Sequence, residues 1–332
     1  MSTRWGIAGT GGIATRFAVD LSLVDDAELV AVASRSGERA DSFADRHGVV
    51  RRHGDYADLA ADPGVDVVYV ATHSARHESD SLLFLEAGKH VLCEKPFALN
   101  ARQARRMVAA ARDRGLFLMD AMWSRFLPSY RSLTDLIGEG RIGDPLLVEA
   151  DFGFRIPVDP AHRLFDPNLG GGALVDLGVY PLQLTSLVLG TPDRIAAVGS
   201  IGSTGVDEQV AAVLHHPGGT IGAVKAAIRV PMICGARIVG TDGWIELAPF
   251  MHCTPSLRVT GTAGRQDLDL NWDGDGIRFQ VLEVQRCIHT GLLESPLMPL
   301  DETVTIIETM DEIRRQIGFA YPDELLDPGT HS

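Results

Sequence analysis

The feature that most constrains the fold is a glycine-rich turn directly after the first apolar run of the chain. Trp5–Ala8 has the composition of a short β-strand, and Gly9-Thr10-Gly11-Gly12-Ile13-Ala14 follows it at the start of a helical pattern. Glycine at the first two positions of a G-x-G-x-x-A motif permits a tight turn and lets the backbone approach a pyrophosphate at the positive end of the helix. Because the motif lies within a strand–turn–helix unit, we interpret Gly9, Gly11, Gly12 and Ile13 as part of a dinucleotide site rather than an ordinary glycine-rich turn.

Apolar runs typical of β-strands alternate with helical patterns from Arg4 to about Asp120. The predicted strands are Trp5–Ala8, Glu28–Ala33, Val65–Ala71, His90–Cys93 and Leu116–Asp120, and the predicted helices include Arg39–His47, Arg76–Gly88 and Ala101–Gly115. This alternation indicates parallel βαβ units. We therefore predict the α/β fold class, with an N-terminal Rossmann domain built on a doubly wound parallel sheet over residues 1–125.

The second part of the chain has a different pattern, with longer alternating strands separated by Gly, Pro and Asp. The predicted strands are Leu146–Phe154, Ile195–Ile201, Gln209–His215, Thr220–Ile228, Arg237–Val239, Trp244–Leu247 and Leu257–Thr260, and the predicted helices are Gly172–Leu189, Phe279–Thr290 and Leu300–Ile317. Successive strands with little helix between them favour an antiparallel sheet. We predict that residues 126–332 form an α+β domain on an open, mostly antiparallel sheet.

Composition excludes several classes of partner. A formal net charge of −14 argues against a broad nucleic-acid surface, because binding phosphates requires clustered Lys and Arg, and a small-molecule partner is favoured. No apolar stretch approaches the length of a membrane span, and the start of the chain lacks the apolar segment of a signal peptide, so we expect no membrane partner. The scattered cysteines, which form no CxxC pair, suit a reducing cytoplasm. They are Cys93, Cys234, Cys253 and Cys287.

The end of the second predicted strand indicates which nicotinamide cofactor is bound. NAD sites place a carboxylate there for the adenosine ribose, but this chain has Ser34-Arg35-Ser36-Gly37-Glu38-Arg39 and no acid at the strand tip. Arg35 and Arg39 can bind a 2′-phosphate, with Ser34 and Ser36 as further donors. The alternative is that both arginines are solvated at a helix start. The missing acid favours NADP over NAD.

Two further elements carry groups suited to acid–base chemistry. Lys95 lies just past a predicted parallel strand, where open α/β sheets build ligand sites, although an isolated Lys-Pro is also common in exposed loops. Asp176 and Tyr180 are four residues apart and fall on one face of the predicted Gly172–Leu189 helix, which Pro181 is expected to kink. A ligand-facing pair and a helix cap with a core tyrosine both fit this pattern.

Taken together, these motifs cover nearly the whole chain and resemble the Gfo/Idh/MocA oxidoreductase family. The resemblance is carried by the glycine turn, Glu94-Lys95-Pro96 and the run from Gly171 to Tyr180. Within the family, the segments Ala121–Pro128 and Glu283–Pro296 are similar to the trans-1,2-dihydrobenzene-1,2-diol dehydrogenases and the NADP-dependent D-xylose dehydrogenases. The resemblance implies a Rossmann domain followed by an α+β domain whose sheet commonly forms a dimer interface.

The resemblance also implies roles for individual residues. Lys95 would bind the nicotinamide ribose and the reacting oxygen, Tyr180 would donate or accept the proton, and Asp176 would orient the substrate and the lysine. The residues expected at the cofactor are Gly9, Gly11, Gly12, Ile13, Ser34, Arg35, Arg39, Thr72, His73, His77, Glu94, Lys95, Trp123 and Arg125. Those expected at the substrate are Trp123, Phe154, Asp176, Tyr180 and Trp272. Inositol dehydrogenases usually carry histidine in place of Tyr180, which argues against an inositol substrate.

Simpler interpretations apply to some of these side chains. His73 and His77 are spaced as two helical metal ligands, but no third ligand has suitable spacing, and we predict no metal site. Each of the aromatic residues Trp123, Phe154 and Trp272 also fits a place in the core. Lysine near a tyrosine favours the phenolate, which makes tyrosine a usable base.

We therefore predict an NADP-dependent oxidoreductase that acts on a secondary alcohol or carbonyl of a cyclic diol or sugar. The alternatives are D-xylose or another aldose as substrate, a non-redox glycosidase that retains its nicotinamide cofactor, and a cofactor-binding sensor without turnover. Strands such as Thr220–Ile228 carry apolar residues on both faces, so we also predict a homodimer through the C-terminal sheet.

Overall fold

The computed structural model describes residues 2–322 and 324, which fall into two compact units. Unit 1 contains the chain up to Ala98, together with Arg102–Phe126 and Trp272–Val304, and unit 2 contains Leu99–Ala101, Leu127–Asn271 and the chain from Thr305 onward. The assignment of Trp272–Val304 to unit 1 therefore differs from the predicted division, in which residues 126–332 form one domain. The helical periodicity of this segment is visible in the sequence, but periodicity does not show which unit its apolar side covers.

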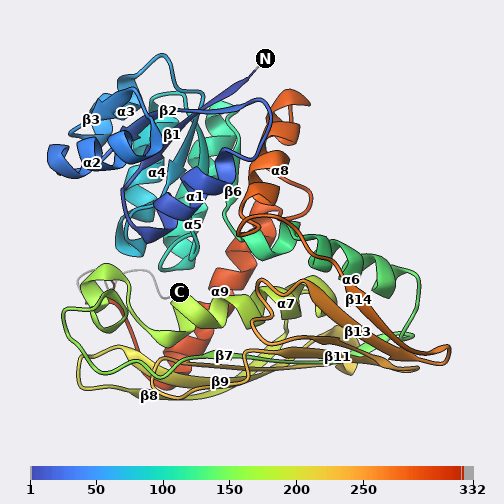
Figure 1. The fold of residues 1–332 in the computed structure, drawn as a ribbon. Helices are drawn as coiled ribbons and strands as arrows, with labels where there is room; N and C mark the ends of the chain where they lie inside the picture. Colours follow the sequence, from blue (N-terminus) through green and yellow to red (C-terminus); the bar gives the residue numbers. More distant parts are fainter. Residues whose placement is uncertain (1, 323, 325–332) are drawn as a thin grey trace. The chain divides into compact units, whose positions relative to one another are not determined.

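Unit 1 is built on a six-stranded sheet in which every strand pairs in parallel with its neighbours (Figure 1). The strand order is β3-β2-β1-β4-β5-β6, the order of a doubly wound dinucleotide-binding sheet, and it confirms the predicted fold class. The strands are β1 (Thr3–Ala8), β2 (Ala27–Ala33), β3 (Arg51–His53), β4 (Val67–Val70), β5 (His90–Cys93) and β6 (Leu118–Asp120).

Five helices of unit 1 lie between these strands along the chain, and a sixth comes from a later segment. They are α1 (Gly12–Leu21), α2 (Gly37–His47), α3 (Tyr56–Ala61), α4 (His77–Glu86), α5 (Ala101–Arg114) and α8 (Arg278–His289), with 3₁₀ turns at Ser74–Arg76 and Trp123–Phe126. Three buried aromatic rings join α1 to the sheet, since Phe17 stacks on Tyr69 at 3.8 Å between centroids and meets Trp5 at 5.5 Å. Burying such large rings dominates the stability of a core.

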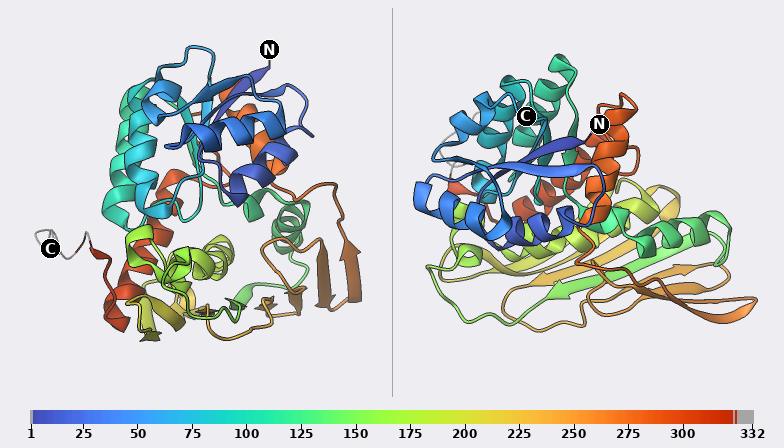
Figure 2. Two further views of the ribbon diagram at one scale, coloured as in Figure 1. Left: turned by 60° about the vertical axis from the view of Figure 1, so that its left-hand side comes forward. Right: turned by 45° about the horizontal axis from the view of Figure 1, so that its top comes forward.

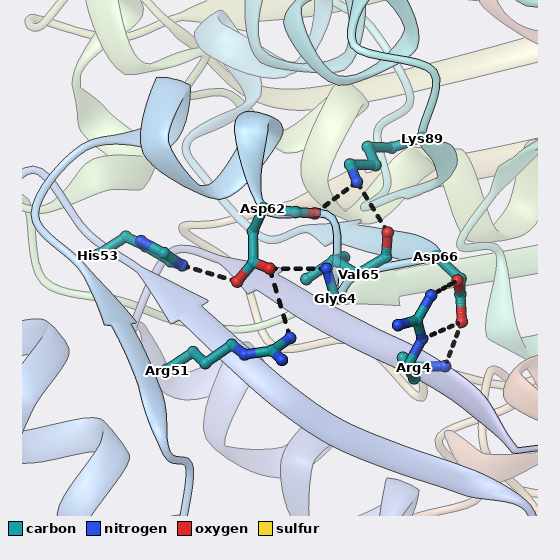
Figure 3. Close-up of polar contacts among 8 residues, drawn as sticks. All are labelled: Arg4, Arg51, His53, Asp62, Gly64, Val65, Asp66 and Lys89. Atoms are coloured by element: carbon teal, nitrogen blue, oxygen red, sulfur yellow. Dashed lines mark hydrogen bonds and ion pairs between the residues drawn. The ribbon is translucent and has the colours of Figure 1, made fainter.

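The turn between α3 and β4 is fixed by the carboxylate of Asp62 (Figure 3). It accepts hydrogen bonds from the backbone N–H of Gly64 at 2.7 Å, from His53 Nε2 at 3.2 Å and from Arg51 Nη1 at 3.3 Å. Burial alone raises the pKa of Asp62, but the hydrogen bonds from Gly64 and His53 and the charge of Arg51 outweigh burial and lower it. The network anchors the three-residue strand β3, whose polar sequence gave no strand signal.

One lysine and one arginine make further hydrogen bonds around this turn (Figure 3). The buried Nζ of Lys89 donates to the carbonyl oxygens of Asp62 at 2.6 Å and Val65 at 2.9 Å. Arg4 at the start of β1 donates to the Asp66 carboxylate through its backbone N–H, Nε and Nη2 at 2.9, 3.0 and 2.5 Å. Together they fix where β4, the central strand, enters the sheet.

Unit 2 is built on an eight-stranded sheet in the order β14-β13-β12-β11-β7-β10-β9-β8. Among the described strands, only β7 and β10 pair in parallel, and the other neighbours are antiparallel, as predicted. The strands are β7 (Pro145–Gly153), β8 (Arg194–Ile201), β9 (Asp207–His215), β10 (Ile221–Ala227), β11 (Ala236–Gly240), β12 (Trp244–Leu247), β13 (Ser256–Gly261) and β14 (Gly264–Asp269).

The helices of unit 2 lie on one face of this sheet (Figures 1 and 2). They are α6 (Pro128–Gly138), α7 (Val179–Leu189) and the part of α9 (Leu300–Ile317) that follows Val304, with a π-helical turn at Leu174–Gly178 and 3₁₀ turns at Arg163–Phe165, Pro167–Leu169 and Pro217–Gly219. No described element of the unit covers the other face, on which Val198 and Val213 are 73% and 49% exposed.

The segment Pro167–Leu189 corrects one expectation about membranes. By length and composition alone it could cross a bilayer, whereas no stretch of that kind was expected from the sequence. Its most apolar 18-residue window is 78% buried, because α7 and the turns before it lie against the eight-stranded sheet. A long apolar helix that is buried in this way is a core element of its unit.

Candidate active site

The glycine turn has the backbone geometry that a bound pyrophosphate requires. Gly9 has φ of 109°, and a Cβ at this position would lie 2.5 Å from the carbonyl oxygen of Ala71, so only glycine fits between β1 and β4. A Cβ on Gly11 or Gly12 would meet nothing within 4 Å, and Gly11, the N-cap of α1, supplies no side-chain cap. There is therefore room beside the backbone at the start of α1, as the close approach of an anion to a helix N-terminus needs.

At the tip of β2, two serines hold the backbone and two arginines extend outward. The buried Oγ of Ser34 accepts from Ser36 N at 3.3 Å, and Ser36 Oγ caps α2 by accepting from Arg39 N at 3.4 Å. The two hydroxyls therefore shape the turn, and the side chains of Arg35 and Arg39 are exposed. No acidic side chain stands at the tip itself.

A third arginine, which sequence reasoning missed, lies near this strand tip. Arg76 donates to the Asp80 carboxylate at 2.6 and 3.3 Å from the 3₁₀ turn after β4. Burial raises the pKa of the Tyr56 phenol and Asp80 adds to this, while Arg35 and Arg76 both oppose it, which places the two cations around one hydroxyl. The sequence context of Arg76, a single basic residue directly before His77, contains no motif that distinguishes it.

The loop after β4 carries three residues assigned to the cofactor. His77 is buried, with Nδ1 2.8 Å from the carbonyl oxygen of Pro96 and Nε2 3.1 Å from that of Thr72, so it links this loop to the turn that carries Lys95. Burial lowers the pKa of His77 although both carbonyl contacts oppose the shift. Thr72 Oγ1 is buried without a partner among the described residues, and His73 is exposed. The described residues contain no cluster of three ligands for a metal ion.

Lys95 follows β5 at the carboxyl edge of the parallel sheet and is half-buried. The preceding Glu94 is buried and accepts from the Tyr69 hydroxyl at 2.5 Å and from the backbone N–H of Lys95 at 3.1 Å. Beside them lies Asp120, at the end of β6. Burial and the charge of Glu94 raise the pKa of Asp120 to about 8, against the opposing charges of Arg125 and Lys95. Two buried carboxyl groups, Glu94 and Asp120, therefore lie near the lysine.

The 3₁₀ turn after β6 holds Trp123 and Arg125, both buried. The guanidinium of Arg16 lies over the Trp123 ring, 5.7 Å from its centroid. Arg125 donates through Nη2 to Glu302 at 2.5 Å and through Nη1 to the carbonyl oxygen of Leu297 at 3.3 Å. The structure thus gives Arg125, expected at the cofactor, a buried ion pair within unit 1.

In unit 2, Asp176 and Tyr180 lie on successive helical elements. Asp176 is in the π-helical turn and Tyr180 is the second residue of α7. The predicted single α-helix from Gly172 is therefore interrupted, and π turns of this kind are frequent at functional sites. Asp176 accepts from Arg163 at 2.9 and 3.2 Å. Sequence reasoning missed Arg163, which is the first residue of a short 3₁₀ turn and lies in no recognisable motif.

Aromatic side chains surround the tyrosine. Phe152 meets the Tyr180 ring edge-on at 5.4 Å, and His252 lies 4.8 Å from Tyr180 and 4.5 Å from Phe152. Phe154 packs edge-on against Phe152 at 5.1 Å, so this candidate substrate residue belongs to the same cluster. His252 was not predicted, because nothing in its local sequence distinguishes it from other loop histidines.

The residues predicted to contact the substrate are divided between the two units. Phe154, Asp176 and Tyr180 lie in unit 2, while Trp123 and Trp272 lie in unit 1. Trp272 is half-buried and packs edge-on against Phe279 of α8 at 6.1 Å. Within unit 2, then, the structure brings an acid, a tyrosine and an aromatic wall together.

Two sequence profiles and a set of relatives match this chain. Residues 3–121 match the profile described as "Oxidoreductase family, NAD-binding Rossmann fold", and residues 130–246 match the "GFO/IDH/MocA C-terminal domain". The chain is 38% identical over 334 residues to the trans-1,2-dihydrobenzene-1,2-diol dehydrogenase of Homo sapiens, covering 98% of this chain and 99% of that one. It is 37% identical over 332 residues to the Xenopus laevis enzyme of the same name, covering 97% and 100%.

Two solved structures show the same arrangement of elements. The aldose-aldose oxidoreductase from Caulobacter crescentus, complexed with glycerol, superposes with a TM-score of 0.88 at 26% identity over 95% of this chain and 97% of that one. A 3-ketoreductase from Actinomadura kijaniata in complex with NADP and TDP-benzene superposes with a TM-score of 0.86 at 26% identity over 96% and 98%.

Proposed function

Since the chain belongs to the Gfo/Idh/MocA oxidoreductase family, as its motifs predicted, and is an NAD(P)-dependent dehydrogenase acting on hydroxyl groups, we propose that it oxidises a secondary alcohol of a cyclic diol with NADP. The observation that carries the proposal is the aromatic surround of Tyr180. Phe152, Phe154 and His252 give this tyrosine an apolar neighbourhood, which suits a carbocyclic ring better than a fully hydroxylated sugar.

In this proposal the residues of the chain supply position and a path for the proton. Nicotinamide, when bound, supplies the hydride chemistry. The Tyr180 phenolate takes the proton from the substrate alcohol during oxidation, and the hydroxyl form of Tyr180 donates a proton during carbonyl reduction. Lys95 binds the reacting oxygen and, as a cation, favours the phenolate form of the tyrosine. Asp176, held by Arg163, accepts a hydrogen bond from the substrate hydroxyl next to the reacting carbon.

For the cofactor, we propose NADP rather than NAD. The open backbone at Gly11 and Gly12 fits a pyrophosphate, and the exposed Arg35 and Arg39 fit a 2′-phosphate at a strand tip without an acid. Gly9, Ile13 and Thr72 would complete this binding surface. The Actinomadura kijaniata structure, in complex with NADP, is consistent with this choice.

The proposals for oligomeric state and cellular location rest on the uncovered sheet face and on the free cysteines. We propose a homodimer formed by the uncovered face of the eight-stranded sheet, where Val198 and Val213 are exposed. The four cysteines are free, and three of them are buried, which fits a reducing cytoplasm.

A second candidate is oxidation of an aldose such as D-xylose at its anomeric carbon. It is favoured by the similarity to the Caulobacter crescentus aldose-aldose oxidoreductase. The experiment that separates the two is a panel assay of NADP reduction with trans-dihydrodiols, xylose, glucose and inositol. The proposed function requires the highest kcat/KM with a dihydrodiol, and a clear preference for xylose or glucose would replace it with the aldose activity. Turnover without net NADP reduction would point to a non-redox glycosidase.

A further inference from the structure

The π-helical turn that carries Asp176 is fixed at its start by a carboxylate from a distant strand. Asp207, the first residue of β9, is fully buried, and its Oδ2 accepts from the backbone N–H of Leu174 at 2.7 Å. Leu174 is the first residue of the turn, so this contact satisfies a donor that the helix cannot pair internally. An acceptor at this place also lies at the positive end of the helix.

Gly172 leaves space for the Asp207 carboxylate. Its φ is 126°, and a Cβ there would lie 2.2 Å from Asp207 Oδ1. The third glycine of the Gly170-Gly171-Gly172 run therefore lets a buried side chain reach the backbone of the turn. The glycine at position 172 therefore makes room for the Asp207 carboxylate.

The same segment is held from a second direction by the C-terminal part of unit 2. Tyr321 is buried and donates from its hydroxyl to the carbonyl oxygen of Gly171 at 2.9 Å. Arg314 on α9 lies 5.0 Å from the Tyr321 ring centroid and donates to Glu324 at 2.6 Å. The side chains that anchor the turn thus come from β9 and from the end of the chain.

We propose that Asp207 is a positioning residue for the reaction, because it fixes the start of the π-helical turn and thereby the places at which Asp176 and Tyr180 present their polar atoms. The inference rests on the proposed function, in which these two residues contact the substrate. Asp176 is two residues beyond the anchored N–H of Leu174, and Tyr180 follows within the next turn. A displacement of the anchored end therefore moves both.

Because Asp207 can ionise, the strength with which it anchors the π-helical turn should depend on pH. Burial raises its pKa to about 7, opposed by the hydrogen bonds from Leu174, from its own N–H and from Ala173, and by Arg314. The charged and titratable groups around it are Arg314, Tyr321 and, near Tyr321, Glu324 and Asp176. An ionised carboxylate holds an N–H more strongly than a neutral one, so the anchoring should strengthen as pH rises through 7.

The test compares Asp207→Ala, which removes the acceptor, with Asp207→Asn, which keeps one. Asp55→Ala is the matched control, since Asp55 caps α3 by accepting from Ala57 N at 2.8 Å. We expect Asp207→Ala to lower kcat by about tenfold or more, with the Kd for NADP unchanged, and Asp207→Asn to recover most of kcat. The ratio of wild-type to Asp207→Asn kcat should rise between about pH 6 and pH 8 as the carboxylate ionises.

A structural readout separates positioning from loss of stability and from failure of the proposed function. The chain has five tyrosines, so 3-fluorotyrosine labelling gives a small fluorine spectrum in which Tyr180→Phe identifies one resonance. At constant pH this resonance should shift in Asp207→Ala and stay in place in Asp55→Ala. An unmoved resonance, or unchanged kcat in Asp207→Ala, would overturn the inference. If the wild type oxidises none of the substrates, a shifted resonance still supports the positioning of Tyr180 while the proposed function fails.

Discussion

Arg163 and Asp176 form a two-bond ion pair, with N–O distances of 2.9 and 3.2 Å, in which the carboxylate side chain is 10% exposed and the guanidinium 51% exposed. The loop before the glycine run thus supplies the cation for a carboxylate on the π-helical turn. Because Arg163 is half exposed, its pairing contributes little to global stability, on the order of 1 kcal/mol or less. Its value lies in holding the carboxylate in one orientation.

Arg163→Gln should therefore lower kcat/KM by about tenfold while the melting temperature changes by only a few degrees. The carboxylate would keep its place on the turn but lose its fixed orientation toward the substrate. Steady-state kinetics and thermal unfolding measure the two effects. The control is Arg194→Gln, which removes an exposed arginine at the start of β8 that pairs with Asp193. Normal kcat/KM in Arg163→Gln would show that Asp176 needs no cation.

Tyr180→Phe should reduce turnover by roughly 10² or more and leave NADP affinity unchanged. The substitution removes the hydroxyl and keeps the ring that packs edge-on against Phe152. Tyr130→Phe is the matched control, because Tyr130 is a buried tyrosine of the same unit whose hydroxyl bonds to Gln183 Nε2 at 3.3 Å. Near-normal turnover in Tyr180→Phe would require another proton donor.

Lys95→Ala should depress turnover and also weaken the binding of NADP. Since the lysine and the tyrosine act on the same oxygen in the proposal, Lys95→Ala combined with Tyr180→Phe should be scarcely slower than the poorer single variant. Additive losses in the double variant would mean that the two residues serve independent steps.

The wild-type protein should bind NADP at least about tenfold more tightly than NAD, a difference of about 1.4 kcal/mol. Replacing Arg35 and Arg39 together with Ala should abolish this preference by weakening NADP alone. Titration of both nucleotides by intrinsic fluorescence measures it, and Arg46→Ala, at the far end of α2, is the control. Equal or tighter binding of NAD by the wild type would contradict the assignment.

Most of the fold could be predicted from the sequence because both sheets carry strong periodic signals. The strands of unit 1 are apolar runs between helices, and the helix Leu300–Ile317 agrees with its prediction at both ends. Several of the elements missed were short or polar, although the 11-residue helix α6 (Pro128–Gly138) was missed as well. Arg51–His53 contains no apolar residue, and Tyr56–Ala61 is only six residues long, less than two helical turns, so neither shows a period.

The candidate site was predictable only where its residues lie in motifs. Lys95, Asp176 and Tyr180 stand in recognisable runs, whereas Arg163, His252 and Asp207 come from loops or a strand start far away in the sequence. A side chain that pairs with a residue 13 or 33 positions away leaves no local pattern. The π-helical turn was equally invisible, because the spacing of Asp176 and Tyr180 fits an α-helix.

The uncovered sheet face should form a homodimer that a single charge disrupts. Val213 lies opposite Ala196 in the register of β8 and β9, and Val198 lies opposite Ala211, which makes a continuous apolar strip on the exposed side. Val213→Asp should shift the mass in light scattering from dimer to monomer at micromolar concentration. Val50→Asp, at a position that is 84% exposed in unit 1, is the control. A monomeric wild type would refute the dimer.

Asp120 should make the protein less stable as the pH rises. Burial and the charge of Glu94 raise its folded pKa to about 8, whereas the carboxyl has its ordinary value of 3.8 when unfolded. Between these two values the folded state keeps a proton that the unfolded state has lost, so the free energy of unfolding falls as the pH increases. The fall is at most about 1.4 kcal/mol per pH unit and ends near pH 8.

Asp120→Asn isolates this effect, because an amide of the same shape cannot ionise. The melting temperature of Asp120→Asn minus that of the wild type should therefore become more positive from pH 5 to pH 8 and then level off. Asp113→Asn, an exposed acid on α5, should show no such trend and controls for the loss of one negative charge. A difference that stays constant across this range would mean that Asp120 is ionised in the folded protein. In that case Lys95 and Arg125 stabilise the carboxylate more strongly than burial and Glu94 oppose it.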